Sequence, residues 1–300
     1  MSSSADPAVV HPSPLTRVPS SALVLGAIGS VQLGAAIAST LFDRVGPGGA
    51  VLLRLAAATV LLVLAWRPRI AGRDRHELVL VCLFGVTLAA MNLAFYSAID
   101  RVPLGIGVTV EFVGPLGVAV FGSRRARDLV WALLAAAGIA ALLPGTSGAD
   151  ATGLLFALLA GAFWAGYILL SARVGRTFHS GSGLALAMIV ATVVAAPFGI
   201  AQGGTALLSG SALAVGAAVG LLSSALPYSL EMEALRRIAP GLFGVLMSLE
   251  PAVAALAGFV VLGQSLRLRE LAGIALVICA SLGATLSRPA GGPARGEVEP

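Results

Sequence analysis

The chain of 300 residues carries 58% hydrophobic and only 11% charged side chains, with a formal net charge of +5. Soluble domains devote about 25% of their residues to charged side chains, so this composition excludes an ordinary soluble enzyme or binding domain and indicates a membrane protein. All of the basic residues are arginines, and none of them forms a cluster interleaved with aromatic residues, which argues against a nucleic-acid partner.

The chain begins with a Ser- and Pro-rich stretch, residues 1–20, whose composition predicts a disordered tail. Apolar segments of roughly the length needed to cross a bilayer, about 17–25 residues, then follow one another with short connections. Cutting the chain at charges, prolines and glycines gives ten predicted spans: 21–41, 46–65, 78–98, 103–122, 129–144, 152–171, 183–200, 211–233, 241–262 and 271–287. Nothing between them is large enough for a catalytic or ligand-binding domain, so we expect the function to lie within the membrane.

The placement of the arginines predicts the orientation. With a cytoplasmic N-terminus, 14 of the 19 arginines lie on the cytoplasmic side and four lie outside, while Arg54 lies within a span. Because cytoplasmic loops hold the excess of basic residues, we predict a multi-pass protein of the plasma or inner membrane with both termini inside. Residues 288–300 then form a cytoplasmic C-terminal tail.

A weak internal repeat relates the two halves of the chain. An offset of 136 residues pairs Arg101 with Arg237, Gly105 with Gly241 and Pro115 with Pro251. Since each half holds five spans, the second copy enters the membrane from the opposite face. The predicted fold is an all-α membrane protein of ten transmembrane helices in two inverted five-helix repeats, 21–145 and 150–287. Secondary transporters use such repeats for alternating access, with the binding site near the bilayer midplane.

Two glutamates lie in the middle of apolar spans, Glu111 in the fourth and Glu250 in the ninth. A carboxyl group at this depth costs about 2.5–3.5 kcal/mol and usually serves a function. Positions 111, 114 and 115 share one helical face, and the repeat gives the ninth span the matching face, so both acids are expected to point to a common centre. We predict that they carry protons or contact substrate; the alternative is a structural hydrogen-bonding role. Pro115 and Pro251 are expected to break the helices beside them.

Other polar residues within the spans extend this candidate site. Arg54 is too deep to reach water comfortably and is expected either to pair with a glutamate or to bind a substrate carboxylate. Asn92, Tyr96, Ser223, Ser224 and Tyr228 suit a polar solute, although interhelical hydrogen bonding explains any single one of them better. Trp164 and Tyr167 either line the cavity or pack against other helices. Glu231, at the end of the eighth span, is a further candidate, which either pairs with a cytoplasmic-side arginine as a gate or, as the better explanation, lies at a solvated helix end.

Several stretches resemble the EamA branch of the drug/metabolite transporter superfamily, and within it the threonine/homoserine exporter group. They are VLLRLAAATVLL, MNLAFYSAIDRVPLGIGVTVEFVGPLGVAVF, SSALPYSLEMEALRRI and GVLMSLEPAVAALAGFVVLGQSL, and the resemblance extends over about residues 21–287. It implies ten helices in two EamA repeats and efflux of small hydrophilic amino acids in exchange for protons. Arg54, Glu111, Tyr228, Glu231 and Glu250 match polar positions of the group.

Three functions remain as hypotheses. The first is a proton-coupled exporter of threonine, homoserine or similar amino acids, and the second is an exporter of another class, such as a lipophilic cation. The third, a membrane-embedded enzyme or receptor, lacks support because His11, His76 and His179 lie in the tail or loops and no cofactor fingerprint occurs. We therefore expect no metal and no cofactor; the sequence does not indicate an oligomeric state. Cys82 and Cys279 are expected to be buried, inert thiols.

Overall fold

A computed structural model describes residues 18–69, 72–121, 128–142, 150–178, 181–235, 243 and 246–286. The described residues form helices and no strands, which confirms the predicted all-α class for this part of the chain. The tail predicted at 1–20 lies outside the described residues up to position 17, as does the C-terminal tail at 288–300. The helices are α1 (Ser20–Ser39), α2 (Phe42–Trp66), α3 (Arg75–Ile99), α4 (Leu104–Glu111), α5 (Val113–Phe121), α6 (Asp128–Leu142), α7 (Ala151–Thr177), α8 (Ser182–Gly203), η2 (Gly204–Leu208), α9 (Gly210–Gly220), η3 (Leu221–Ala225), α10 (Leu226–Leu235), α12 (Glu250–Leu262) and α13 (Leu268–Leu286).

The helices fall where the sequence predicts spans. In the described part of the chain, six stretches are long and apolar enough to cross a membrane: α1, α2, α3, α7, α8 together with η2, and α13. Four further apolar helical stretches are shorter and correspond to the predicted fourth, fifth, eighth and ninth spans. The ninth is described continuously only from residue 246 onward. Length and composition together therefore indicate a multi-pass membrane protein.

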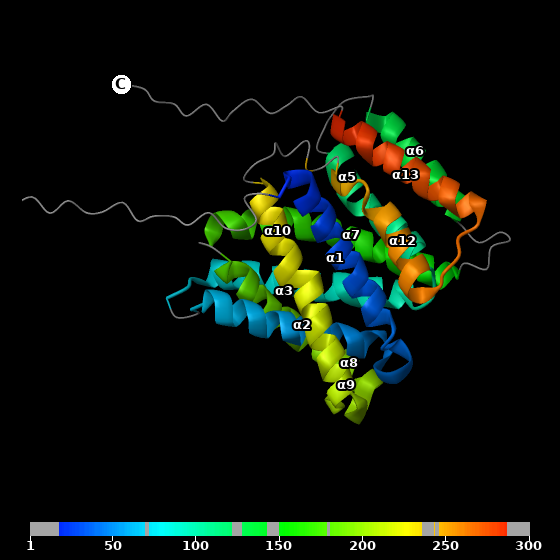
Figure 1. Ribbon diagram of the computed structural model, residues 1–300. Coiled ribbons are helices and arrows are strands. Elements are labelled where there is room, and N and C mark those ends of the chain that lie inside the picture. Colours follow the sequence, from blue (N-terminus) through cyan, green and yellow to red (C-terminus); the bar gives the residue numbers. More distant parts are fainter. Residues whose placement is uncertain are drawn as a thin grey trace, which may run out of the picture.

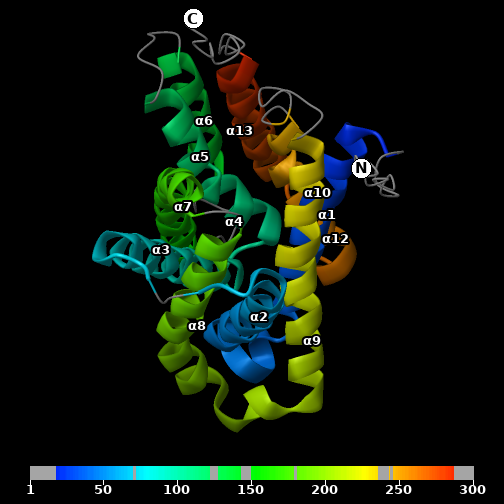
Figure 2. The ribbon, with the colours of Figure 1, turned by 90° about the vertical axis from the view of Figure 1, so that its left-hand side faces the viewer.

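The helices pack mainly in pairs drawn from the two halves of the chain. α2 packs against α8, α3 against α7, α4 against α12, and α6 against α13. The pair α6 and α13 stands side by side in both views, and α9, η3 and α10 follow one another as a single column beside α1 (Figures 1 and 2). Helices from the first and second halves are therefore interleaved rather than stacked as two separate bodies.

Glycine permits the closest of these helix approaches. A Cβ atom on Gly161 of α7 would lie 2.6 Å from the backbone oxygen of Glu111 at the end of α4. Gly138 of α6 and Gly273 of α13 face each other in the same manner, since a Cβ on either would lie 2.8 Å from the other's carbonyl oxygen. In lipid, close packing replaces the hydrophobic effect as the force that joins helices, and small residues make such packing possible.

Three of the helical columns are interrupted near the centre of the molecule. α4 ends at Glu111 and α5 begins at Val113, so the predicted fourth span is two short helices. Pro115 has no N–H to donate to the carbonyl of Glu111, four residues earlier. In the ninth span a turn at residues 248–249 precedes α12, whose first residues are Glu250 and Pro251. Between α9 and α10 the column widens into the π-helical turn η3.

The predicted burial of the two cysteines is wrong. Cys82 of α3 and Cys279 of α13 are both exposed on the outside of the helix bundle. A sequence does not distinguish an apolar helix face that packs on protein from one that faces lipid, because lipid tails are as apolar as leucine.

Candidate functional site

A cavity of about 220 Å³ lies at the centre of the interleaved helices, next to the interruptions. α1, α2, α3, α4, α7, η3, α10 and α12 all contribute side chains to it. Its lining consists of Val31, Gln32, Ala35, Arg54, Met91, Asn92, Phe95, Val108, Glu111, Trp164, Tyr167, Ser223, Pro227, Glu231, Met247 and Glu250.

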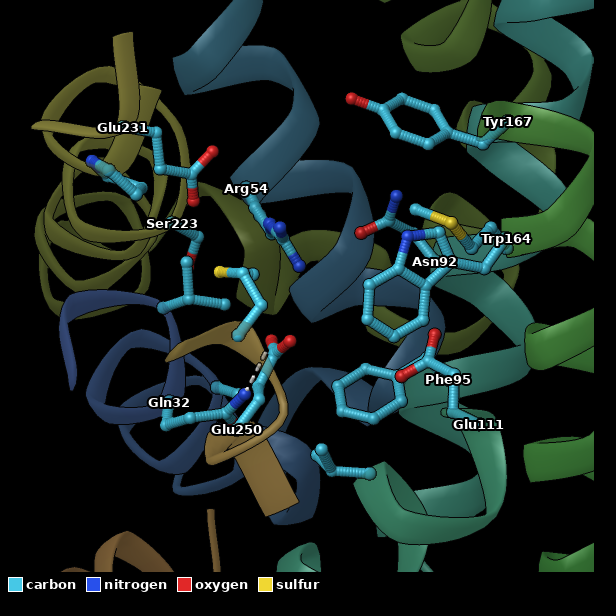
Figure 3. A pocket seen from close by; sticks show the side chains of 16 residues that line it. Gln32, Arg54, Asn92, Phe95, Glu111, Trp164, Tyr167, Ser223, Glu231 and Glu250 are labelled. Atoms are coloured by element: carbon cyan, nitrogen blue, oxygen red, sulfur yellow. Dashed lines mark hydrogen bonds between the residues drawn. The ribbon is translucent and has the colours of Figure 1, made fainter. Parts of the chain in front are cut away.

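Figure 3 shows that the labelled side chains form two walls. The first wall is polar and comes from α1, η3, α10 and α12; its labelled residues are Gln32, Ser223, Glu231 and Glu250. The second wall comes from α3, α4 and α7 and is largely aromatic, with Asn92, Phe95, Glu111, Trp164 and Tyr167. Arg54 extends from α2 between the two walls. The cavity therefore offers three carboxyl groups, one guanidinium group and an aromatic surface to a bound solute.

The interrupted helices place the two predicted glutamates at helix ends. Glu111 is the last residue of α4 and is 8% exposed, while Glu250 is the first residue of α12 and is 7% exposed. Gln32 donates a hydrogen bond from Nε2 to Glu250 Oε1 over 3.0 Å, joining α1 to α12 (Figure 3). Glu111 and Glu250 line the same cavity, in agreement with the common centre expected from the internal repeat.

Arg54 contacts both the hydroxyl and the ring of Tyr96. Its Nη1 atom donates to the Tyr96 hydroxyl over 3.4 Å, and its guanidinium carbon lies 5.6 Å from the centre of the same ring. Among the side chains that the structure describes, no carboxylate lies within ion-pairing distance of Arg54. In this part of the structure Arg54 therefore forms no ion pair with Glu111 or Glu250.

Three buried polar atoms at the cavity have no hydrogen-bond partner among the described residues: Gln32 Oε1, Ser223 Oγ and Glu250 Oε2. All three belong to the polar first wall. An unpaired buried polar atom costs about 1–3 kcal/mol, so nearly all such atoms in proteins find a partner. The three residues that carry these atoms line the cavity, so the unsatisfied polar groups of the site lie on this one wall.

The structure brings most of the predicted site residues together. Arg54, Asn92, Glu111, Glu231 and Glu250 line the cavity, as do Ser223, Trp164 and Tyr167. Tyr96 is fully buried behind Arg54 instead of facing the cavity, and Ser224 is buried outside the lining. The side chain of Tyr228 lies outside the described part of the structure. Pro115 and Pro251 flank the site without lining it.

Sequence reasoning missed Gln32, Phe95 and several apolar lining residues. The signal for Gln32 was present, since it is an amide in the middle of a predominantly apolar first span. Within the described residues, no group of three or more His, Cys, Asp or Glu side chains is arranged to hold a metal ion.

Comparison with known proteins identifies the family. A profile of the EamA-like transporter family matches residues 151–286. The threonine/homoserine exporter RhtA of Escherichia coli K12 is 45% identical over 271 residues, which cover 88% of this chain and 90% of RhtA. The chain belongs to the EamA-like transporter family. Within this family it falls in the RhtA group, and RhtA of Salmonella typhimurium LT2 is 44% identical over the same shares of both chains.

More distant relatives agree with this assignment. The uncharacterized transporter YwfM of Bacillus subtilis is 27% identical over 75% of this chain and 79% of its own. One crystal structure superposes on 89% of this chain and 97% of its own chain with a TM-score of 0.60, and its 20% identity shows a shared fold alone. As a member of the EamA-like family the protein is a transmembrane transporter and not an enzyme.

Proposed function

We propose that this EamA transporter exports threonine, homoserine or similar small hydrophilic amino acids across the inner membrane in exchange for protons. The observation that carries the proposal is the central cavity, which presents a guanidinium group and carboxyl groups to one small solute. An amino acid zwitterion needs both signs of charge, and Arg54 supplies the positive one. RhtA, the relative at 45% identity, is named for threonine and homoserine export.

The size of the cavity suits a small solute. Its volume of about 220 Å³ is below the 300–1,000 Å³ that is usual for drug-sized ligands. At about 30 Å³ per water it corresponds to roughly seven waters. The covalently bonded atoms of threonine need less room than that many waters, so the cavity accommodates threonine and leaves space for water beside it.

In the proposed complex Arg54 binds the substrate carboxylate. Its planar guanidinium offers two parallel N–H donors to the two carboxylate oxygens, and such charge-assisted pairs are among the stronger hydrogen bonds. Tyr96 holds the guanidinium group through a cation–π contact with its ring and through the 3.4 Å hydrogen bond to its hydroxyl. Tyr96 thus acts by positioning Arg54, and Asn92 with Glu231 completes the polar lining.

Glu111 and Glu250 are proposed to carry the proton. A carboxyl group in apolar surroundings holds its proton more readily than one in water, so it can load on one side of the membrane and release on the other. Because both acids line the same cavity, protonation and substrate occupancy compete for one space. One of the two acids would meet the substrate ammonium group or exchange it for a proton.

Alternating access is proposed to follow from two inverted repeats of five spans each, residues 21–145 and 150–287. The packing of the helices supports this arrangement. If each span of the first half is matched with the span at the same place in the second half, α1 corresponds to α7, α3 to α10, and α4 with α5 to α12. The contact between α1 and α10 then corresponds to the contact between α7 and α3, and the contact between α1 and α12 corresponds to that of α7 with α4 and α5. The pairs α2–α8, α4–α12 and α6–α13 map onto themselves. Rocking of one pseudo-symmetric half against the other would expose the cavity to each side in turn. Both termini then lie in the cytoplasm, as the arginine distribution predicts.

Export of an organic cation is the second candidate, and one observation favours it. The cavity lining holds three carboxyl groups against one guanidinium, and Phe95, Trp164 and Tyr167 supply aromatic faces that attract cations. Arg54 opposes this candidate, since its fixed positive charge would repel a cation.

Counterflow in proteoliposomes separates the two candidates. Vesicles loaded with unlabelled threonine should accumulate external radiolabelled threonine, and external homoserine should compete while ethidium should not. The Arg54→Gln variant, which keeps a polar side chain but loses the charge, should lose this exchange. Competition by ethidium without any threonine exchange would favour the cation exporter and contradict the amino acid proposal.

A further inference from the structure

The two polar ends of a zwitterion need different partners, and the cavity has an obvious partner only for the carboxylate end. The guanidinium of Arg54 lies between the walls, whereas carboxyl groups occur on both walls. The three buried atoms without a hydrogen-bond partner all belong to the first wall, so this wall is the better place for the substrate ammonium group. We propose that Gln32, Ser223 and Glu250 together bind the α-ammonium group of the substrate, an inference that rests on the proposed function.

The chemistry of the three atoms fits an ammonium group. Gln32 donates its amide N–H to Glu250 Oε1, and this orientation leaves its Oε1 atom as an acceptor only. Glu250 Oε2 is an acceptor when the carboxyl group is ionised, and the Ser223 hydroxyl is able to accept as well. An ammonium group presents three N–H donors and no acceptor, so it matches the number and the kind of the three atoms. A substrate hydroxyl has one hydrogen to donate and would leave two acceptors unpaired.

Local structure holds these acceptors in place. Gln32 is 2% exposed, Ser223 is 5% exposed and Glu250 is 7% exposed. Ser223 lies in the π-helical turn η3, and in the neighbouring helix Ser30 donates a 2.6 Å hydrogen bond to the carbonyl oxygen of Leu222. A π-turn inside an α-helix is often found at functional sites. Here it lies beside α1, on which Gln32 sits.

Glu250 and Glu111 differ in the neutral acceptors that lie beside them. Glu111 lies on the aromatic wall, and Gln32 and Ser223 lie on the opposite one (Figure 3). Glu250 combines its charge with two neutral acceptors on the same wall, as an ammonium site requires. The assignment gives the substrate a direction in the cavity, with its amino group toward α1 and α12 and its carboxylate toward Arg54 of α2.

The test compares two ligands that differ only at the amino group. 3-Hydroxybutyrate is threonine with the α-amino group replaced by hydrogen, and it keeps the carboxylate and the hydroxyl. Their binding to the purified full-length protein is measured by competition against radiolabelled threonine. The wild type should bind threonine more tightly than 3-hydroxybutyrate. Gln32→Met and Ser223→Ala should each weaken threonine binding by about tenfold and leave 3-hydroxybutyrate unchanged, since each removes one hydrogen bond to a charged group.

Ser224→Ala is the matched control, because Ser224 is buried beside Ser223 but does not line the cavity. It should leave both affinities at the wild-type values. The ammonium site is wrong if both cavity variants keep the wild-type ratio of the two affinities, or if they weaken both ligands equally. A wild-type protein that binds no amino acid at all would instead refute the proposed function on which the site rests.

Discussion

Replacing Gly161 with alanine would force apart two helices that form the aromatic wall of the cavity. The added Cβ atom would lie 2.6 Å from the Glu111 carbonyl oxygen, 3.3 Å from its carbonyl carbon and 3.4 Å from its Cα. Carbon–oxygen contacts across helix interfaces settle at about 3.3 Å, so the deficit is about 0.7 Å. All three neighbouring atoms belong to backbone, and no side chain can rotate away. α7 must therefore separate from α4, taking Glu111 and Trp164 out of position.

The energetic effect follows from two opposing contributions. Overpacking of this kind costs about 1–3 kcal/mol, while replacing glycine by alanine within a helix gains up to about 1 kcal/mol. Gly166 lies in the same helix, and its Cβ would make an ordinary 3.5 Å contact with Thr87 Cγ2. Gly166→Ala thus has the gain without the cost and serves as the matched control. The two variants should differ in stability by about 1–3 kcal/mol.

Thermal unfolding of the two purified variants in detergent measures this difference. Gly161→Ala should unfold at a lower temperature than Gly166→Ala and should bind threonine more weakly than the wild type, because Glu111 has moved. Gly166→Ala should unfold no earlier than the wild type and keep its affinity. If Gly161→Ala is as stable as Gly166→Ala and transports normally, the close contact between α7 and α4 is not as described.

Three further predictions concern binding, coupling and orientation. Arg54→Lys keeps the charge but loses the planar fork, so threonine affinity should fall by about tenfold or more; an unchanged affinity would rule out a bidentate carboxylate contact. Glu111→Gln should abolish uptake driven by a proton gradient in everted vesicles, whereas Glu77→Gln, which alters a capping residue at the start of α3, should not; proton-driven uptake at the wild-type rate would remove Glu111 as a proton carrier. In a chain freed of its native cysteines, an impermeant maleimide added to intact cells should label Arg44→Cys and not Arg75→Cys, and the reverse pattern would invert the proposed orientation.

Much of the fold could be predicted from hydropathy alone, because each span must satisfy its backbone hydrogen bonds internally and therefore forms a helix. The positions of Pro115 and Pro251 also indicated where helices would break, and the described breaks lie within four residues of each proline. The π-turn at η3 had a comparable signal, because Pro227 lies two residues beyond it and has no N–H to donate to a carbonyl four residues earlier. This proline was overlooked as a signal, since it lies inside a continuous apolar span.

The site was predictable where a charge made a residue conspicuous. Arg54, Glu111 and Glu250 stand out because a charge within a span is costly. Gln32 was overlooked because it carries no charge and has no matching polar residue in the weak repeat, and its hydrogen bond to Glu250 is what places it at the candidate site. Tyr96 was expected among the polar lining, yet it lies beneath Arg54. Sequence gives the polar character of a residue but not whether it faces the cavity or supports a neighbour that does.

Substrate-driven proton flux tests the central claim most directly. The purified protein is reconstituted in proteoliposomes that hold a trapped pH dye, and threonine, homoserine or ethidium is added outside. We predict a proton flux opposite to the amino acid flux with threonine and with homoserine, and no signal with ethidium. A response to ethidium alone would contradict the account and identify a cation exporter, and amino acid transport without any proton flux would refute the antiport mechanism.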